Sequence, residues 1–536
     1  MQQVVLSSDI LTQACLQDQG TAAVQTLFEL ARNKTVTLWT HPHAVTEGCA
    51  RLQASPEMNP AQRMAELLEI VHLLPAPGVQ LKQALALIQE HPQMSAADLP
   101  FLLSAAAARE YLEEFLFVGL EAGRAFPGGN VHSPEDCLDL LNGQIDTGPI
   151  PFVDLRTQQH DILPALESNV FQVIKSCRFI LGPEVEKLEK RLAEYVQIEH
   201  AISCSSGTEA LVLALLSLDI GPKDAVFTTP FTFIATAGAI CQVGATPVFV
   251  DIDPRTFNLD PVQLETAILA LARGDANHPL PRDAAGLTPR AVLTVDLFGL
   301  PADHQRIQNI AAKYGLVVIE DAAQAFGGEE RGSKACTLGE IGCTSFFPAK
   351  PLGAYGEGGA CFTRNSALAE TMRSIRVHGQ GTSRYEHARL GTNARLDSLQ
   401  AAILLAKMHV FPAELARRAD AATAYTRLLS QVKALKTPIV PDGFASAWAQ
   451  YSLLARDKAH RDACQGALRE QGIPTMIYYP IPLHLQRVFM PLGYSPGDFP
   501  ETEQVSQKIF SLPMHPYLSS RTQERIAAIL RNVNAS

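Results

Sequence analysis

From about residue 200 to residue 330, short apolar segments alternate with amphipathic helical patterns, and this alternation limits the possible folds most strongly. One such segment, VVIED at 317–321, follows a helical pattern at about residues 303–314. Strands that alternate with helices predict a mainly parallel sheet covered on both faces. Ligands of such sheets bind beyond the carboxyl ends of the strands. We therefore expect an α/β fold whose functional residues follow its strands.

Turn-forming residues divide the chain near residues 142–152, in the stretch NGQIDTGPIPF. Before this break, the apolar runs VVLSS, TVTLWT and FLFVGL alternate with helical patterns and predict a separate α/β domain. A length of 536 residues corresponds to about three core units. We predict an N-terminal domain at 1–145, a large sheet domain at 146–412 and a smaller C-terminal α/β domain at 413–536.

Composition excludes several classes of protein. The net charge of −11 argues against a protein that coats nucleic acid, so we expect no nucleic-acid partner. Ten cysteines are scattered without a CxxC pair, which predicts neither a metal site nor a disulfide framework and fits a reducing cytoplasm. The apolar runs are too short for a membrane span, and the first residues do not form a signal peptide. We expect a cytoplasmic protein.

Residues with chemical potential follow the predicted strands. Ser206-Gly207-Thr208 opens a helix after a strand, where backbone amides and a hydroxyl can bind an anion, although many helices are capped in this way. Phe231 and Phe233 lie at a strand-to-helix turn and could cover a planar ligand or simply pack in the core. Lys350 lies in the glycine-rich stretch SFFPAKPLGAYGEGG and is either a solvated loop residue or an amine that binds a ligand covalently.

Asp321 gives the sharper indication. It ends a very apolar strand, and a buried carboxylate at such a tip needs a compensating partner. A protonated pyridine nitrogen would serve, and Gln324 could reach a hydroxyl on the same ring. Pyridoxal 5′-phosphate needs all of these groups together: a lysine, a carboxylate, a stacking ring and a phosphate cradle.

At this point the sequence resembles the DegT/DnrJ/EryC1/StrS sugar aminotransferases, which are fold-type I pyridoxal-phosphate enzymes. The resemblance covers about residues 150–536. Its motifs follow the family's order and spacing, and they are SCSSGTEALVLAL, PFTFIATAGAI, IEDAAQAFGG, SFFPAKPLGAYGEGG, GTNARLDSLQAAIL and YYPIPLHLQ.

The resemblance implies a role for each matching residue. Lys350 would bind the cofactor covalently, Asp321 would contact the pyridine nitrogen and Gln324 the ring hydroxyl. The remaining cofactor contacts would come from Gly207, Thr208 and Ser345 at the phosphate, from Phe233 over the ring, and from Asn393, which would reach the phosphate from the second subunit of a homodimer. Some relatives replace the lysine with histidine and become dehydratases, so Lys350 favours transamination.

The resemblance also indicates a substrate class. L-Glutamate would donate the amino group and leave as 2-oxoglutarate, and the acceptor would be a nucleotide-linked keto-sugar. The form of the lysine motif is most similar to members that aminate a UDP-linked 3-keto uronic acid, of the UDP-2-acetamido-3-keto-glucuronic acid type, for surface polysaccharides such as O-antigen. Arg395 and His484 match positions that could pair with a sugar carboxylate or diphosphate, although His484 could equally be a structural loop residue. VDLFG at 295–299 departs from the His and Tyr that many members carry.

Residues 1–141 resemble a PIN-type nuclease domain that has lost part of its metal site. Glu47 and Asp98 match two of the expected carboxylates, whereas Ser7 replaces the first aspartate and Asp9 lies two residues further on. A divalent ion needs its charge partners, so we interpret this domain as inactive and as an interaction or regulatory module. The alternative function is a regulatory or RNA-processing protein whose aminotransferase-like part is not catalytic.

Overall fold

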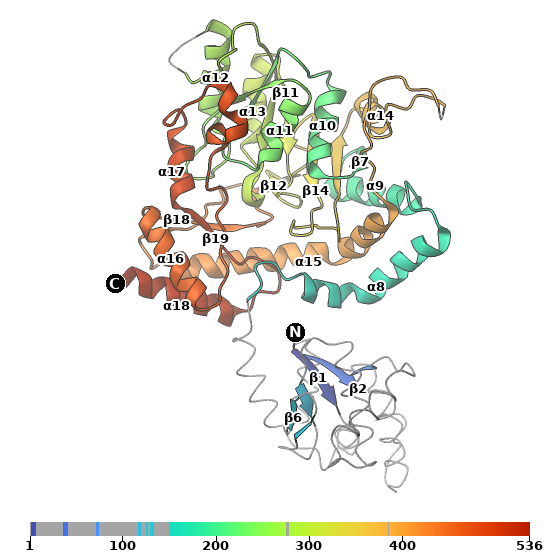
Figure 1. Ribbon diagram of the computed structural model, residues 1–536, viewed down its shortest axis with the longest axis vertical. Helices are drawn as coiled ribbons and strands as arrows, with labels where there is room; N and C mark the ends of the chain where they lie inside the picture. Colours follow the sequence, from blue (N-terminus) through green and yellow to red (C-terminus); the bar gives the residue numbers. More distant parts are fainter. Residues whose placement is uncertain are drawn as a thin grey trace. The chain divides into compact units, whose positions relative to one another are not determined.

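The computed structural model describes residues 150–274, 278–383 and 385–535, together with a six-stranded sheet among the first 148 residues. The chain forms two compact units, Met1–Gly148 and Pro149–Ser536 (Figure 1). The first unit's strands have the order β3-β2-β1-β4-β6-β5. Their bounds are β1 (Gln2–Leu6), β2 (Val36–Thr40), β3 (Val71–Leu73), β4 (Leu116–Val118), β5 (Ala125–Phe126) and β6 (Gly129–His132). Three of them lie where VVLSS, TVTLWT and FLFVGL predict strands.

Four residues that bear on the predicted nuclease site, Ser7, Asp9, Glu47 and Asp98, lie outside the described residues. The PIN-like assignment of this unit therefore stays a prediction.

A seven-stranded sheet in the order β7-β15-β14-β11-β10-β8-β9 forms the core of the second unit. Only β15 runs antiparallel to its neighbours within this sheet, which agrees with the predicted, mainly parallel arrangement. The strands are β7 (His200–Cys204), β8 (Asp224–Thr228), β9 (Thr246–Phe249), β10 (Thr288–Val295), β11 (Val317–Asp321), β14 (Ile341–Ser345) and β15 (Gly359–Thr363).

Helices cover both faces of this sheet because successive strand residues point to opposite sides. Leu293 and Ile319 pack in the cluster that contains α10, whereas Val292 and Val318 pack in the cluster that contains α12 and α13. Apolar residues on both faces explain why these strands read as continuous hydrophobic runs. The helices of this unit's sheet layers are α9 (Pro183–Val196), α10 (Gly207–Ser217), α11 (Ile234–Gln242), α12 (Pro261–Arg273), α13 (His304–Lys313) and α14 (Ser366–Ile375).

The long helix α15 (Ser398–Leu429) packs against α8 (Leu155–Ser176) and α9, and Figure 1 shows α15 and α8 side by side. By length and composition α15 could cross a membrane, but half of its most apolar window is buried inside the unit. Its buried residues include Lys407, Glu414 and Arg418, as expected for a core helix of a folded protein. Glu414 and Arg418 make hydrogen bonds, and the Lys407 ammonium lies over the Tyr355 ring at 4.1 Å. The predicted boundary at residue 412 falls inside this helix, which continues through Pro412.

The C-terminal part is a three-stranded antiparallel sheet, β16-β18-β19, covered by helices. Its core gathers Tyr425, Tyr451 and Phe510, all 0% exposed. The elements are β16 (Leu435–Lys436), β18 (Tyr451–Ala455), β19 (Ile509–Leu512), α16 (Lys458–Glu470), α17 (Pro500–Lys508) and α18 (Ser520–Ala535).

Candidate active site

The N-terminus of α10 forms the first part of the site. Ser206 caps the helix by accepting a hydrogen bond from the Glu209 amide at 3.1 Å, so the Gly207 and Thr208 amides at the helix start are left for a ligand. Ser345, at the end of β14, lies against this turn: a Cβ added to Gly207 would sit 2.6 Å from the Ser345 Cβ. Only glycine allows the start of α10 and the end of β14 to approach so closely, and the result is a cradle for an anion.

Asp321, at the end of β11, is buried with 5% of its surface exposed. Its Oδ2 accepts a hydrogen bond from the Thr236 hydroxyl at 2.8 Å, and its Oδ1 accepts one from the Ala323 amide at 3.2 Å. Burial raises the pKa of Asp321, and the Thr236 bond, the Ala323 bond and the Lys350 ammonium oppose this rise. A buried carboxyl held by two donors is ready to accept a cationic partner.

Lys350 lies in the loop that links β14 to β15, where its amide donates to the Phe347 carbonyl at 2.9 Å. The chain doubles back here so tightly that a Cβ on Gly353 would lie 2.4 Å from the Pro348 carbonyl oxygen. This explains why a lysine is surrounded by glycines. Burial lowers the pKa of Lys350, and the nearby Asp321 carboxylate partly reverses this effect.

Phe233 and Gln324 complete the site. Phe233 precedes α11 and is 56% exposed, so its ring is open to a ligand rather than packed in the core like Phe231. Gln324 accepts from the Phe298 amide at 2.7 Å and donates to the Tyr479 hydroxyl at 2.9 Å. The Tyr479 ring also lies 6.4 Å from that of Phe233, so it contacts two predicted site residues.

Asn393 and Arg395 lie on the segment between α14 and α15. Asn393 is exposed and Arg395 is half-buried, and a short bridge pairs Asn393 with Val377. The structure brings neither side chain into a described contact with Lys350 or Asp321. An exposed Asn393 fits its predicted contribution to a second subunit's site.

The side chain of His484 is buried. It lies on a short helix, η3 (Leu483–Leu485), with 1% of its surface exposed. Its Nε2 faces Glu503 Oε1 at 3.1 Å, and its ring packs edge-on against Phe499 with centroids 4.8 Å apart. These contacts are those of the structural alternative, and the predicted substrate roles of His484 and Arg395 stay predictions.

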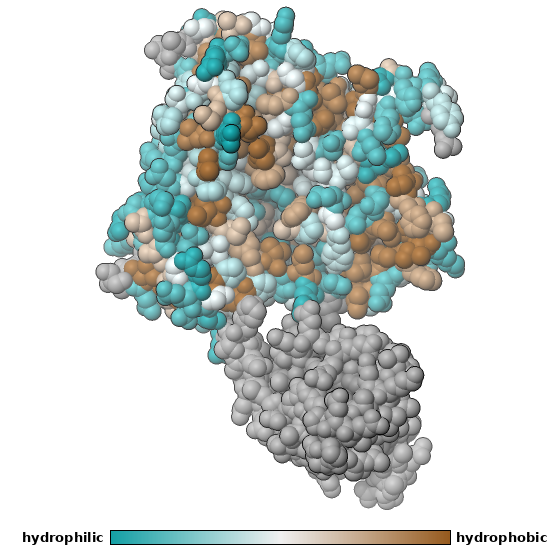
Figure 2. Space-filling view, viewed as in Figure 1, coloured by the Kyte–Doolittle hydropathy of each residue, from teal (hydrophilic) through white to brown (hydrophobic). Residues whose placement is uncertain are grey.

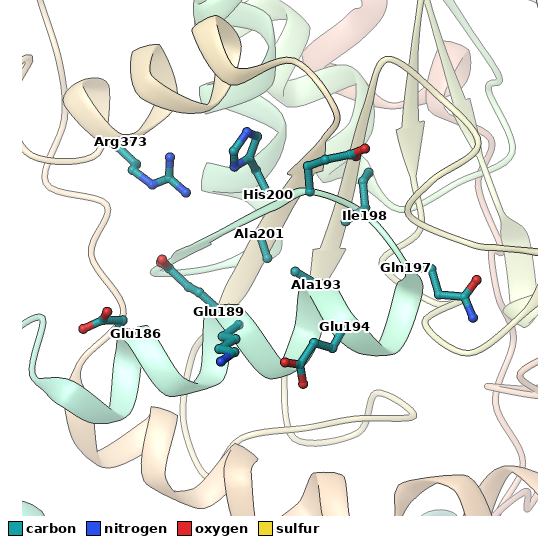
Figure 3. Close-up of a pocket in the computed structure, with 11 residues that line it drawn as sticks. Glu186, Glu189, Ala193, Glu194, Gln197, Ile198, His200, Ala201 and Arg373 are labelled. Carbon is teal, nitrogen blue, oxygen red and sulfur yellow. The ribbon is translucent and has the colours of Figure 1, made fainter.

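An open groove of about 600 Å³ lies elsewhere, along α9 and the start of β7 (Figure 3). Glu189, Glu194, His200 and Arg373 are among its lining residues. None of the predicted site residues lines it. Glu194 is exposed, whereas Glu189 forms an ion pair with Arg376 and accepts from the Ser203 amide at 2.9 Å, so these glutamates serve the surface and the fold rather than this chemistry.

The described groups fit pyridoxal 5′-phosphate. An anion cradle, an open aromatic ring, a buried carboxyl and a half-buried lysine with a lowered pKa match the phosphate, ring, pyridine nitrogen and aldehyde of that group. Sequence reasoning missed Thr236 and Tyr479, which hold Asp321 and Gln324. Both lie in the motif stretches PFTFIAT and YYPIPLHLQ, but their partners are 85 and 155 residues away in sequence.

The fold and these groups together define a fold-type I pyridoxal-phosphate enzyme. The chain belongs to the DegT/DnrJ/EryC1/StrS aminotransferase family, which it matches over residues 161–531. It is 43% identical over 385 residues, 72% of this chain and 100% of the relative, to a UDP-2-acetamido-2-deoxy-3-oxo-D-glucuronate aminotransferase of Pseudomonas aeruginosa. It is 39% identical over 384 residues, 71% of this chain and 97% of the relative, to a UDP-N-acetyl-3-dehydro-alpha-D-glucosamine 3-aminotransferase of Acidithiobacillus ferrooxidans. A crystal structure of a DegT DnrJ EryC1 StrS aminotransferase from Brucella abortus is similar with a TM-score of 0.68 and 43% identity, covering 72% of this chain and 100% of that one.

Proposed function

We propose that this protein transfers an amino group from L-glutamate to a UDP-linked 3-keto uronic acid of the UDP-2-acetamido-3-keto-glucuronic acid type. The observation that carries the proposal is the meeting of Lys350, Asp321 and the Gly207–Ser345 cradle beyond the strand ends of one sheet. The substrate class is supported by the named activity of the P. aeruginosa relative. The product would enter surface-polysaccharide synthesis, for example of an O-antigen.

Pyridoxal phosphate supplies the electron sink that allows an amino group to leave one molecule and enter another. The chain's residues bind it, orient it and move protons. Lys350 Nζ would take the proton from the glutamate α-carbon and later return a proton to the sugar C3, because its lowered pKa makes the neutral amine accessible. Asp321 would hold a positive pyridine nitrogen, and Thr236 would keep the carboxylate oriented.

Gln324 and Phe233 would fix the plane of the bound ring. Gln324 Oε1 accepts a hydrogen bond from the Phe298 amide, and Gln324 Nε2 donates one to the Tyr479 hydroxyl. Two anchors at one amide leave little rotational freedom, so the group that Gln324 presents to the ring hydroxyl is pre-organised.

We also propose a homodimer with shared active sites. Phe171, Ile174, Phe179 and Ile180 lie on or directly after α8 and are between 43% and 60% exposed. Figure 2 shows hydrophobic side chains gathered over the same part of the unit. Large exposed apolar patches mark interaction surfaces, and a second copy would cover this one while bringing Asn393 to its neighbour's phosphate cradle.

The cytoplasm is the proposed location. The seven cysteines among the described residues are free thiols, as expected in a reducing compartment. The alternative, a regulatory or RNA-processing role with an inactive aminotransferase part, is disfavoured because Lys350, Asp321 and Gln324 keep the chemistry that transamination needs.

The test is an assay of 2-oxoglutarate formation from glutamate with two acceptors, the 3-keto uronic acid and its neutral 3-keto-glucosamine counterpart, both UDP-linked. We expect faster turnover with the uronic acid. Arg395→Met should reduce turnover of the uronic acid selectively if the guanidinium binds the sugar carboxylate, and of both acceptors if it binds the diphosphate. If neither acceptor is turned over, the proposal is refuted.

A further inference from the structure

Three buried ionisable residues, Asp296, Glu320 and His304, lie directly behind the proposed cofactor site. Glu320 precedes Asp321 on β11, so its side chain points to the opposite face of the sheet. Asp296 follows β10, and His304 begins α13. The exposed fractions are 0% for Asp296 and Glu320 and 1% for His304. The proposed transamination uses none of the three directly.

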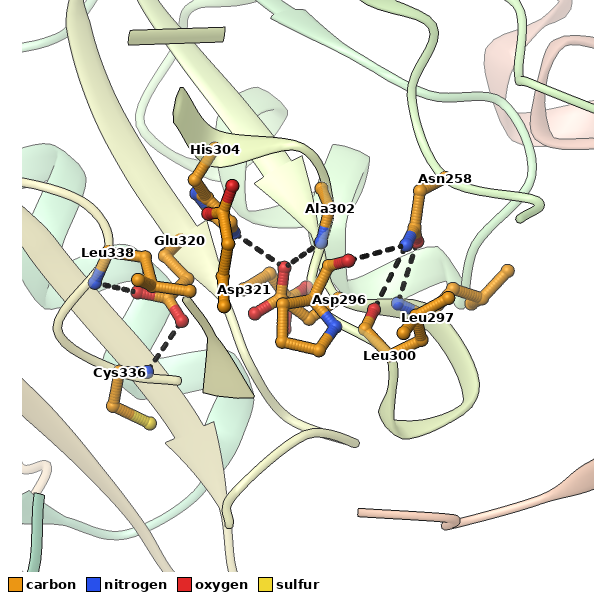
Figure 4. Close-up of polar contacts among 12 residues, drawn as sticks. Asn258, Asp296, Leu297, Leu300, Ala302, His304, Glu320, Asp321, Cys336 and Leu338 are labelled. Carbon is orange, nitrogen blue, oxygen red and sulfur yellow. Dashed lines mark hydrogen bonds and ion pairs between the residues drawn. The ribbon is translucent and has the colours of Figure 1, made fainter. Parts of the chain in front are cut away.

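Hydrogen bonds connect this cluster to the backbone around it (Figure 4). Asp296 Oδ1 lies 2.7 Å from His304 Nε2 and accepts from the Ala302 amide at 2.9 Å. Glu320 accepts from the Cys336 amide at 2.5 Å through Oε1 and from the Leu338 amide at 2.8 Å through Oε2. The Ala302 bond makes Asp296 Oδ1 an acceptor, so His304 Nε2 carries the hydrogen.

These contacts indicate where a proton is held. A carboxylate oxygen of Asp296 and one of Glu320 lie within 4.8 Å of each other, and two buried carboxylates this close cannot both be ionised. Glu320 meets a backbone donor at each oxygen, which stabilises its charged form. Asp296 Oδ2 has no hydrogen-bond partner among the described residues, so it is the oxygen free to carry a hydrogen. Burial raises the pKa of Asp296 to about 8, although its contact with Glu320 opposes this rise. Burial and the nearby charge of Asp296 raise the pKa of Glu320 to about 8.

The cluster also connects to the proposed site residues. The Asp296 amide donates to the Asp321 carbonyl at 3.0 Å. Asp296 starts the turn η2 (Leu297–Gly299), whose Phe298 amide donates to Gln324. Phe298 has φ 61°, a left-handed conformation that is costly for a bulky residue and persists only when its surroundings hold it. The Asn258 side chain helps to hold this turn, because it accepts a hydrogen bond from the Leu297 amide and donates one to the Leu300 carbonyl, both at 2.9 Å.

We propose that Asp296, Glu320 and His304 are positioning residues: a buried carboxyl pair that shares one proton, held on Asp296, and fixes the turn that orients Asp321 and Gln324. The positioning half of this inference rests on the proposed function, whereas the shared proton does not. The three groups also lie close enough together to hold a metal ion, with ligand atoms within 4.8 Å of one another. The proton is favoured because two backbone amides already occupy Glu320 and because Asp296 and His304 already bind each other.

The shared proton predicts a specific pH dependence. A carboxyl whose folded-state pKa is raised binds a proton that the unfolded chain has lost, so stability falls as the pH rises towards the folded-state value of about 8. Other groups that act on the carboxyl pair are Asp321 on β11, Cys336 and Glu330 on β12 (Glu329–Glu330), and Asp303 at the start of α13 acts on His304. Buried histidines change stability below pH 6.5, so the window from pH 6.5 to 8 isolates the pair from them.

The experiment compares Asp296→Asn with Asp296→Leu in the full chain. Asparagine accepts from His304 and Ala302 as aspartate does, and its amide mimics the protonated oxygen without being able to ionise. Unfolding by urea is followed through Trp448 fluorescence in a Trp39→Phe background, because these are the chain's two tryptophans. Between pH 6.5 and 8, the equilibrium constant for unfolding should increase with pH in the wild type. For each pH unit, this increase should exceed that of Asp296→Asn by a factor of up to about ten. Equal slopes would overturn the shared proton.

Pyridoxal phosphate binding tests the positioning role. Asp296→Leu leaves the Ala302 amide and His304 Nε2 without an acceptor and releases the turn that holds Gln324. Its dissociation constant for pyridoxal phosphate should be about fivefold or more higher than that of Asp296→Asn. Should Asp296→Leu fail to fold, His304→Leu, which removes one donor, takes its place.

Each outcome is decisive. Equal affinities of Asp296→Asn and Asp296→Leu for pyridoxal phosphate would overturn the positioning role. Stoichiometric metal in the purified wild type that is lost in Asp296→Asn would show that the cluster binds a metal ion instead of a shared proton. A wild type that binds no pyridoxal phosphate would refute the proposed function, while the pH slope would still test the proton.

Discussion

Thr236 on α11 donates its hydroxyl to Asp321 Oδ2 across 2.8 Å, and both side chains are buried. Thr236→Val keeps the side-chain shape and removes this donor. A hydrogen bond to a charged group contributes about 1.5–3 kcal/mol, so kcat/KM should fall by about tenfold or more while the cofactor stays bound. Thr266→Val on the exposed face of α12 is the control, and an unchanged kcat/KM in Thr236→Val would contradict the role of this contact.

Asp321→Asn should bind cofactor but lose most activity, because an amide cannot keep the ring nitrogen protonated.

Lys350→Ala should abolish both turnover and the visible absorption of the bound cofactor. The loop around Lys350 is held by backbone contacts at Phe347 and Gly353 rather than by the amine, so the fold should persist. Absorption spectra and the circular dichroism of the same samples separate the two effects. Lys433→Ala removes an exposed lysine and should behave like the wild type. Full activity in Lys350→Ala would refute the proposed chemistry.

Asn393 should act across subunits. A mixed dimer of Lys350→Ala and Asn393→Asp chains contains one site with both substitutions and one with neither, so it should recover up to half of the wild-type activity per dimer. Activity is measured after the two proteins have exchanged subunits, which differently tagged chains can demonstrate. If activity does not return in a mixture that has exchanged, Asn393 belongs to its own chain's site.

His515 should make the second unit sensitive to acid. It is 3% exposed, and burial lowers its pKa to about 4. The unfolded chain then binds a proton below pH 6.5 that the folded chain refuses, so stability falls as the pH drops from about 6.5 to 4, by up to about 1.4 kcal/mol per pH unit. Urea unfolding of His515→Gln should show a smaller loss over this range than the wild type. The same substitution at the exposed His409 should leave the pH dependence unchanged, and equal slopes in both variants would exclude His515 as a cause.

The sequence predicted what depends on local patterns. The strand that ends at Asp321, the Ser206–Thr208 turn and the loop around Lys350 all follow from periodicity and glycine placement within short segments. Contacts between distant segments were not predictable, since the Gln324–Tyr479 bond joins residues 155 apart and has no local signal. The enclosure of His484 by Glu503 and Phe499 depends on how α17 packs. The boundary predicted at residue 412 falls inside α15, whose contacts with α8 and α9 have no local sequence signal.

Catalysis should not require the first unit. The proposed cofactor residues all lie beyond residue 200, within the compact unit Pro149–Ser536. A chain that begins at Gly148 should therefore bind pyridoxal phosphate and transaminate with a kcat similar to that of the full protein. Size-exclusion chromatography and the glutamate assay on the same preparation check this. A truncated chain that folds and dimerises but does not turn over would show that the first unit completes or regulates the active site.

The first unit itself should not cleave RNA. Ser7 cannot supply the charge that an aspartate would bring to a divalent ion, so the expected metal site lacks a ligand. Incubation of the full chain with single-stranded RNA and Mg²⁺ or Mn²⁺ should give no more product than incubation with EDTA. Cleavage that needs the metal and disappears in Glu47→Gln or Asp98→Asn would overturn the interpretation of an inactive domain. Cleavage that survives both substitutions would point to a contaminating nuclease. The variant Ser7→Asp tests whether restoring the missing carboxylate is sufficient to create a metal-dependent activity.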